Sequence, residues 1–366
     1  MTLQIYWRLP THGDGRTLHP ETWSRGDYSS QRKQPHVFSR TGVQRDGYTY
    51  FDQLAQIGRA AELSGFDGLW IQNTSSGEET QVVSSALARE VRRLKFVPAL
   101  FTPLLSAVYS AKIAVSFQRL SGGRLDWNFH FEDEGTQHWH GRHFSLADQV
   151  ARTEEFLTLV KGFWSQEKFI YQGRFYEVEN GGFPPSLQGE RLPRIHISGN
   201  LDDALELSAK HADVHVLPVL PLAELRQRIE QIDALAATHG RRIEYALEAD
   251  ILVRHNDDAA WTELRRQWQQ ETSKTVLITG QSTHNAPFED HIAGSNIWAG
   301  FQTLRPGVPH GLVGGYENVA NRLAEYVDAG VGHLVLSSPP HLEEAYRFGE
   351  FVIPHLRAKV PARAIA

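Results

Sequence analysis

The sequence contains no cysteine and only one methionine among its 366 residues. The missing thiols exclude disulfides, thiolate metal ligands and cysteine nucleophiles, and they are consistent with a reducing compartment. No apolar run approaches the roughly 20 residues that a membrane-spanning helix needs. The formal net charge is −6, so there is no excess of positive charge that would attract nucleic acid. The first residues, MTLQIYWRLP, also lack the basic start and apolar core of a signal peptide. We therefore expect a cytoplasmic protein that binds neither nucleic acid nor a membrane.

The chain is rich in short β-branched runs that alternate with longer segments of helical spacing. Such alternation is typical of a parallel sheet with helices outside it. About eight repeats predict an α/β fold, a single (β/α)8 TIM barrel over residues 1–366, which is longer than the roughly 250 residues typical of one barrel. The predicted strands cover residues 3–9, 68–71, 94–101, 125–131, 195–197, 214–217, 246–253 and 331–337.

The last strand-turn-helix unit places polar residues where barrel enzymes keep their active sites, at the carboxyl end of a strand. Ser337 and Ser338 end the strand, and Pro340 requires the next helix to begin beyond it. In that helix we predict a buried apolar stripe at Leu342, Tyr346 and Phe351.

Two segments interrupt the alternation and account for the extra length. Residues 16–47 are polar, contain several arginines and have few apolar anchors, which predicts a long surface loop after the first strand. Residues 272–310 include a stretch rich in Ser, Thr, His, Asn and Gly, and we interpret them as an insertion that folds over the barrel mouth as a lid.

Several polar residues fall at predicted strand ends, and each has an ordinary explanation beside the functional one. His12 lies in a glycine-flanked turn, so it is either a site residue or a solvated side chain. Asn128 lies within a strand and must be hydrogen-bonded either to a ligand or to neighbouring backbone. Residues 198–200, Ser-Gly-Asn, precede a helix and are either a phosphate site or a plain N-cap. Arg305 in the lid is either solvated or a clamp for an anionic substrate.

The densest polar cluster of the chain follows the fourth predicted strand. Histidine and carboxylate ligands suit zinc or iron, but the spacing matches no helical HExxH pattern. A glycosidase acid–base pair is a further alternative, and a polar pocket wall or solvated loop is the interpretation we favour. The cluster consists of His130, Glu132, Asp133, Glu134, His138, His140 and His143.

Taken together, five segments resemble the bacterial luciferase-like flavin monooxygenases, most closely the FMNH2-dependent alkanesulfonate monooxygenases. The similarity runs in order from about residue 3 to residue 356. The carrying segments are YWRLPTHGDG (6–15), RLKFVPAL (93–100), LSGGRLDWN (120–128), NIWAG (296–300) and SSPPHLEEAYRFGE (337–350).

The resemblance implies a single barrel, a homo-oligomer such as a dimer or tetramer, and reduced FMN supplied by a separate NAD(P)H-dependent flavin reductase. Molecular oxygen is the co-substrate, and a sulfonate would lose sulfite and leave an aldehyde. His12, His130 and His341 are then expected to steady the reactive oxygen species or move protons, since imidazole titrates near working pH. Predicted substrate contacts are Arg8, Asn73, Glu248, Asp250 and Arg305, predicted flavin contacts are Ala99, Asn128, Ser198, Gly199 and Asn200, and no metal is expected.

This chain departs from the sulfonate enzymes at several positions of the resemblance. An arginine and a histidine are replaced by Glu248 and Asp250, which reverses the local charge. An unpaired carboxylate near a bound sulfonate would be strongly unfavourable. The other departures are Gly77 for a cysteine, Val150 for a phosphate-contacting tyrosine, Asn200-Leu201 for a serine pair and Pro339 for a tyrosine.

Two explanations of the substrate stay open. Arg8, Arg305 and arginines of the 16–47 loop hold a sulfonate while Glu248 and Asp250 bond its hydroxyls, as a sugar sulfonate would need, or the substrate is uncharged or cationic. Two alternatives to an oxygenase also stay open: a flavin-binding protein that has lost catalysis, and a TIM-barrel hydrolase that uses the cluster at 130–143.

Overall fold

The computed structural model describes residues 2–11, 13, 50–74, 77–131, 144–199, 202–279, 286–305 and 308–360. The predicted loop at 16–47 and the sites His12 and Asn200 lie outside these residues, as does most of the His/carboxylate cluster at 130–143. Within the described residues, no helix is both long and apolar enough to cross a membrane.

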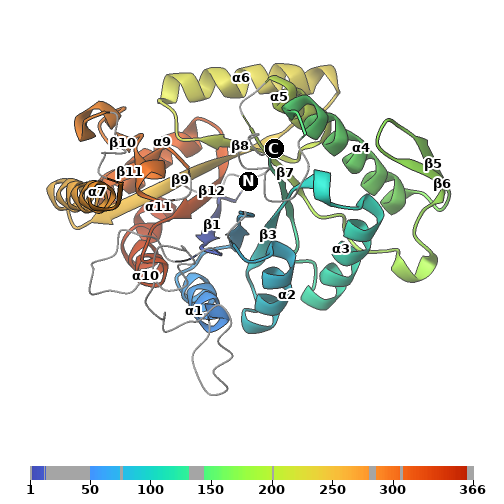
Figure 1. The fold of residues 1–366 in the computed structure, drawn as a ribbon, viewed down its shortest axis with the longest axis horizontal. Helices are drawn as coiled ribbons and strands as arrows, with labels where there is room; N and C mark the ends of the chain where they lie inside the picture. Colours follow the sequence, from blue (N-terminus) through green and yellow to red (C-terminus); the bar gives the residue numbers. More distant parts are fainter. Residues whose placement is uncertain are drawn as a thin grey trace.

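Eight parallel strands close into a barrel, because β8 pairs with β9, β9 with β12, and β12 with β1 (Figure 1). Each of the eight predicted strands is present, so the predicted TIM barrel is confirmed. In ring order these are β1 (Gln4–Leu9), β2 (Gly68–Ile71), β3 (Lys95–Leu100), β4 (Trp127–Phe129), β7 (Ile195–Ser198), β8 (Val214–Pro218), β9 (Glu244–Arg254) and β12 (Val331–Ser337).

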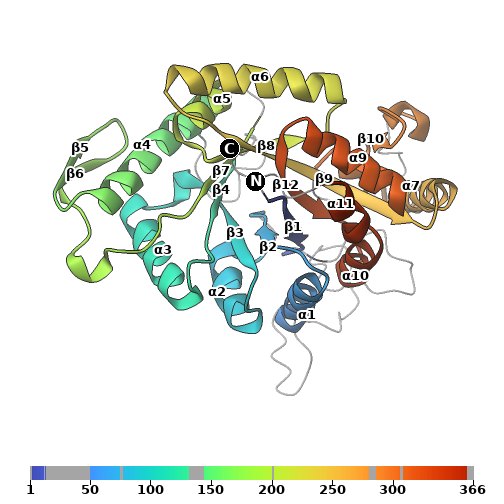
Figure 2. The ribbon, with the colours of Figure 1, turned by 180° about the vertical axis from the view of Figure 1, so that it is seen from behind.

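Helices surround the barrel on its outer side in both views (Figures 1 and 2). Local sequence sets their ends, as in α3, where the Ser106 side chain caps the first turn and Gly122 ends the helix in the left-handed conformation. They are α1 (Tyr50–Leu63), α2 (Thr80–Glu90), α3 (Ala107–Ser121), α4 (Leu146–Ser165), α5 (Asp202–His211), α6 (Leu222–Thr238), α7 (Asp257–Thr279), α9 (Tyr316–Asp328), α10 (His341–Phe351) and α11 (Ile353–Lys359), with short 3-10 turns at Thr102–Leu104 and Pro185–Leu187.

Helix α10 begins directly after Pro340 as predicted, but two of the three residues of the predicted buried stripe are wrong, and only Leu342 packs against the main core. Tyr346 and Phe351 are 45% and 40% exposed, and Phe351 stacks on Tyr316 at 4.8 Å rather than entering the core. The buried positions, which follow the spacing i, i+3, i+4, i+7, are His341, Glu344, Ala345 and Phe348. Two of these four residues are polar, so hydrophobicity alone indicated the wrong face.

The hairpin of β5 (Phe169–Gln172) and β6 (Glu177–Gly181) is an addition that the sequence did not predict. It lies at the periphery beside α4, away from the barrel (Figures 1 and 2). Gly162 of α4 lets the Phe169 ring pack against the helix, since a Cβ there would lie 2.3 Å from that ring. The hairpin is thus joined to the outside of the fold.

A second addition separates β9 from β12 and contains part of the predicted lid. Its strand β11 (Gly311–Gly315) pairs parallel to β9, and β10 (Ile297–Trp298) pairs antiparallel to β11. Helix α7 (Asp257–Thr279) runs into the predicted insertion, and a 3-10 turn covers Phe288–His291 within it. A separate hydrophobic core holds this insertion, formed by Leu252, Ala260, Leu264, Trp268, Phe288, Trp298, Phe301, Leu304 and Val313. The boundaries 272–310 remain a prediction.

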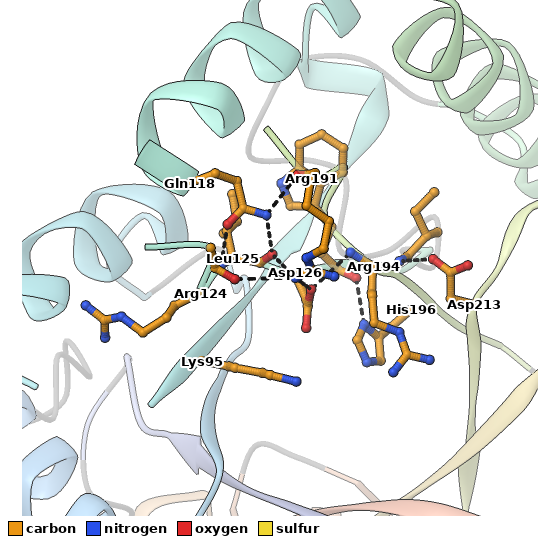
Figure 3. Close-up of polar contacts among 12 residues, drawn as sticks. Lys95, Gln118, Arg124, Leu125, Asp126, Arg191, Arg194, His196 and Asp213 are labelled. Atoms are coloured by element: carbon orange, nitrogen blue, oxygen red, sulfur yellow. Dashed lines mark hydrogen bonds and ion pairs between the residues drawn. The ribbon is translucent and has the colours of Figure 1, made fainter. Parts of the chain in front are cut away.

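Carboxylates fasten the amino ends of the strands. Asp67 accepts the backbone N–H of Ile5 at 2.8 Å, and Asp213 accepts that of Ile195 at 2.8 Å. In Figure 3, Asp126 lies between two arginines, accepting the backbone N–H of Arg194 at 3.0 Å and the side chain of Arg191 at 2.9 Å. Each aspartate precedes its own strand and bonds the start of the neighbouring one. These bonds therefore fix the strands relative to one another.

Candidate active site at the carboxyl ends of the strands

Side-chain alternation identifies the residues that line the barrel mouth. Seven residues form an interior layer: Tyr6, Trp70, Val97, Val214, Val216, Ala246 and Val335. Because side chains two residues apart on a strand face the same way, the next inward positions lie at the carboxyl ends of the strands. This argument gives Arg8, Gln72, Ala99, Pro218, Glu248, Asp250 and Ser337 as the rim of the mouth, and the strand register adds Asn128 and Ser198.

One side of the rim, from β9 to β2, carries a chain of charged and polar contacts. Arg8 bonds both carboxylates: its Nη1 group donates to Glu248 at 3.1 Å, and its Nη2 group donates to Asp250. The Gln72 amide donates to Glu248 at 2.8 Å. At the other end, Nε of Arg305 donates to the second oxygen of Asp250 at 3.0 Å. The structure thus brings together four of the five predicted substrate residues, while Asn73 is half-buried one residue beyond Gln72.

The two arginines balance the two carboxylates in a buried setting. Burial alone would lower the pKa of Arg8, but the Asp250 and Glu248 carboxylates outweigh it and raise that pKa. Burial lowers the pKa of Arg305, and the single carboxylate of Asp250 compensates only in part. The four side chains sum to zero charge, which explains how Asp250 is tolerated at 0% exposure.

The guanidinium of Arg305 has unused hydrogen-bonding capacity. Its Nη1 and Nη2 atoms are buried and have no hydrogen-bond partner within the described part of the chain. Its carbon Cζ lies 4.9 Å from the centre of the Phe301 ring. Leaving buried donors unsatisfied is costly, and the paired Nη groups of an arginine match the two oxygens of a carboxylate, sulfonate or phosphonate. An oxoanion at this position would satisfy both Nη groups of Arg305.

On the opposite side of the rim, the described mouth residues of β3, β4 and β7 are uncharged. Ala99 pairs with Asn128 across β3 and β4, and Ser198 Oγ donates to the Asn128 side-chain oxygen at 3.1 Å. Gly199 has φ +150°, and a Cβ there would lie 2.9 Å from the Cβ of Ala204. Four predicted flavin residues thus adjoin one another, and Asn200 lies outside the described residues.

The chemistry of this uncharged side fits a flavin ring better than a flavin phosphate. A buried amide and a hydroxyl are the neutral donors and acceptors that a ring with several carbonyls and nitrogens needs. In contrast, α5 begins with Asp202 and Asp203, whose carboxylates already occupy the positive end of the helix dipole and would repel a phosphate there.

The predicted catalytic histidines lie in different surroundings. His130 is half-buried just past β4, with its ring 6.0 Å from that of Phe101. His341 is buried at the start of α10, and its ring packs edge-on against Trp7 at 5.9 Å. Since Arg8 faces the barrel interior, Trp7 faces the helices, which places His341 on the helix side of β1. His12 lies outside the described residues.

Two departures from the sulfonate enzymes have local explanations. A Cβ at Gly77 would lie 2.7 Å from Oγ1 of Thr74 and 2.8 Å from Oγ1 of Thr11. A cysteine side chain at this position therefore requires both threonines to move. Val150 is buried in α4, where it packs in the main core and offers no hydroxyl group.

Sequence reasoning missed three contributors to the site. Gln72 directly follows a predicted strand, a position that marks mouth residues in barrels. Phe301 is apolar, so a search for polar residues at strand ends does not find it. Glu344 is buried between Arg254 at 3.2 Å and Arg347 at 3.2 Å. Burial raises the pKa of Glu344 in spite of both arginines, and its charge acts on Arg305.

Comparisons with known proteins agree with this geometry. Residues 34–333 match the family model described as luciferase-like monooxygenase. Three solved structures share the fold. A riboflavin lyase crystallised with modified FMN and riboflavin is 16% identical, with TM-score 0.73 over 98% of this chain and 92% of that one. A long-chain alkane monooxygenase is 17% identical, with TM-score 0.73 over 98% and 92%. An F420-dependent secondary alcohol dehydrogenase in complex with an F420-acetone adduct is 14% identical, with TM-score 0.67 over 98% and 100%.

Proposed function

This chain belongs to the luciferase-like monooxygenase family, and we propose that it is a two-component monooxygenase that uses reduced FMN and O2 to cleave a polar organosulfonate. The proposal includes a separate NAD(P)H-dependent flavin reductase, a homo-oligomeric state and a cytoplasmic location. Family membership supports flavin-dependent oxygenation, and the substrate class is our own inference.

The proposed reaction balances without a further reagent. A sulfonate R–CH2–SO3⁻, O2 and FMNH2 give an aldehyde R–CHO, sulfite, oxidised FMN, water and one proton. Oxygen receives two electrons from the reduced flavin and two from the carbon that becomes the aldehyde. Bound reduced FMN would supply the activation of O2. The residues of this chain bind and orient the substrate and the flavin, and they exclude water.

Arg305 carries the proposal. Asp250 fixes its Nε edge and leaves two buried Nη groups without a partner among the described residues. A tetrahedral sulfonate presents oxygens that these groups can bond in pairs. Arg8 is engaged with both carboxylates, so in this proposal it neutralises them beside the substrate.

The charge balance of the rim restricts the substrate further. Since the arginines and carboxylates of the rim cancel, a singly charged sulfonate adds one uncompensated charge and a dianion adds two. A monoanion is therefore preferred. The Glu248 side chain is 12% exposed, which leaves it able to accept a substrate hydroxyl, whereas both oxygens of the fully buried Asp250 are already bonded.

The flavin ring is assigned to the uncharged side of the rim. Ala99, Asn128, Ser198 and Gly199 adjoin one another there, with Asn200 next in the chain. Proton transfer is assigned to His12, His130 and His341. His341 is the least direct of these, because it lies against Trp7 on the helix side of β1.

A flavin titration followed by a sulfite assay tests the function. We expect fluorescence changes with FMN but not with F420, and sulfite release only with reduced FMN, O2 and a hydroxylated sulfonate. Failure to bind FMN in either redox state removes the oxygenase. Binding without sulfite release from any sulfonate supports the flavin-binding protein that has lost catalysis, and flavin-independent hydrolysis supports the barrel hydrolase.

The clamp is tested by Arg305→Ala, with Arg265→Ala as the matched control. Arg265 also stacks on a phenylalanine of the insertion, 5.0 Å from the Phe288 ring, but its side chain is 46% exposed. Arg305→Ala should raise the sulfonate KM at least tenfold through loss of a bidentate contact and leave FMN affinity unchanged. Equal KM values in both variants would remove Arg305 from the site.

A further inference from the structure

The NIWAG segment (296–300) forms the centre of the insertion's aromatic core. Trp298 is fully buried in β10, and its indole N–H donates to the backbone oxygen of Phe288 at 3.3 Å. Its ring stacks on Phe288 at 5.3 Å and meets Trp268 edge-on at 5.5 Å. Trp298 therefore has aromatic neighbours on several sides and a fixed orientation.

Phe301 connects this core to the guanidinium at the barrel rim. Its ring meets Trp298 at 5.0 Å and 87°, and the Arg305 guanidinium lies 4.9 Å from its centre. The backbone also joins the two residues, because the N–H of Arg305 donates to the carbonyl of Phe301 at 3.1 Å. An aromatic ring attracts a guanidinium that lies over its face, and this contact limits the orientations that the guanidinium can adopt.

A glycine in β11 makes this approach possible. Gly311 pairs with Asp250 on β9. A Cβ at Gly311 would lie 2.5 Å from the Phe301 ring and 2.2 Å from the backbone oxygen of Asp250. Only a residue without a side chain admits the ring beside the strand that carries Asp250, and Arg305 thereby reaches that carboxylate.

We infer that Phe301 is a positioning residue that orients Arg305 for the substrate oxoanion. Asp250 holds the Nε edge, the Phe301 ring supports the guanidinium, and the two Nη groups remain for the substrate. The inference rests on the proposed function and assigns a part in substrate binding to the residue that directly follows the NIWAG segment.

A purely structural role does not explain this arrangement. A buried cation with two unsatisfied donors does not stabilise an aromatic core, because removing those donors from water is unfavourable. The stack of Arg265 on Phe288 in the same core avoids that penalty, because Arg265 is largely exposed and pairs with Glu289. The same core therefore contains one solvated and one buried version of the contact.

The test compares Phe301→Leu with the matched control Phe288→Leu, which removes the aromatic face under Arg265 instead. With reduced FMN, O2 and the sulfonate that gives most sulfite, Phe301→Leu should raise KM about 3- to 30-fold, the range that cation–π contacts cover between exposed and desolvated sites. The kcat and the FMN dissociation constant should change less than twofold. Phe288→Leu should lower Tm without raising KM.

A double-mutant comparison separates this inference from the proposed function. If Phe301 acts through Arg305, then Phe301→Leu should have no further effect on KM in an Arg305→Ala background. If Arg305→Ala itself leaves KM unchanged, the proposed clamp is wrong. If Arg305→Ala raises KM but Phe301→Leu does not, or if Phe288→Leu raises KM equally, only the positioning role is overturned. Phe301→Met, whose flexible side chain fills irregular space, replaces Phe301→Leu if that variant does not fold.

Discussion

At the amino ends of the barrel strands, three aspartates bond main-chain N–H groups of the neighbouring strand, whereas at the carboxyl ends Glu248 and Asp250 bond arginine side chains. A carboxylate on the main chain fixes the distance between two strands. A carboxylate on an arginine fixes the direction in which a cation can act. The same chemical group therefore supports the fold at one end of the barrel and the proposed substrate site at the other, as the division of labour in TIM barrels leads one to expect.

Removal of one carboxylate from the carboxyl end of the barrel should give the largest loss of stability. Asp250→Asn leaves Arg8 and Arg305 buried with one negative charge fewer, and breaking a buried ion pair from one side costs about 3–5 kcal/mol. We expect the free energy of unfolding in urea to fall by about that much. Glu248→Gln is the control, and its loss should be smaller because Glu248 is partly exposed. A loss for Asp250→Asn within the error of the control would contradict the buried charge balance.

Acid should destabilise the barrel near its amino end. His215, the second residue of β8, is fully buried, and burial lowers its pKa to about 3. The unfolded chain takes up this proton near pH 6.5 and the folded chain does not, so stability present above pH 6.5 is lost as the pH falls towards 3. Between pH 7.5 and 5 the loss from His215 alone is about 2 kcal/mol.

Urea midpoints at pH 7.5 and 5.0 measure this loss, with His215→Asn compared with the parent protein. The variant lacks the titrating group and should show a shallower pH dependence. An unchanged slope would mean that His215 takes up its proton in the folded state.

At the amino end, loss of a main-chain contact should affect stability alone. Asp126→Ala deprives the Arg194 N–H and the Arg191 side chain of their acceptor, which costs about 1.5 kcal/mol. The urea midpoint should fall while the sulfonate KM stays within twofold of the parent value. A raised KM in a folded variant would show that the two ends are coupled and would remove the contrast between them.

The smallest effect on activity is expected at Gln72, which is the last residue in the row of charged and polar contacts at the rim. Gln72→Leu keeps the volume and removes one hydrogen bond to Glu248, worth about 1 kcal/mol. Because Glu248 keeps its bond to Arg8, activity should fall only a few fold, as measured by initial rates of sulfite release. A drop as large as that of Arg305→Ala would assign Gln72 a direct substrate contact.

The barrel was predictable because its strands are short and apolar and alternate with segments of helical spacing. The hairpin β5–β6 was not, since it lies outside that alternation. The α10 stripe was predicted on the wrong face because His341 and Glu344 are buried polar residues. Hydrophobic periodicity does not detect a buried residue whose partner lies elsewhere in the chain.

The candidate site was predictable as a set of residues but not as a set of contacts. Arg8, Glu248, Asp250 and Arg305 were each selected from strand ends or from the resemblance. Their pairing joins positions about 240 residues apart for Arg8 and 55 apart for Arg305. Barrel closure brings Arg8 to the two carboxylates, and the pairing of β11 with β9 brings the insertion that carries Arg305 to Asp250. The sequence showed a reversal of local charge, and the structure shows that two arginines cancel it.

Strand β9 belongs to two structures in succession. One edge of this 11-residue strand pairs with β12, where Asp250 is opposite Ser337. The other edge pairs first with β8 and then, from Asp250 opposite Gly311, with β11. The residue at this changeover is also the one that holds Arg305. Exchange of the segment between β9 and β12 for one from another barrel would then keep the ring closed and present a different group to the mouth, which makes this junction a natural place to graft new specificity.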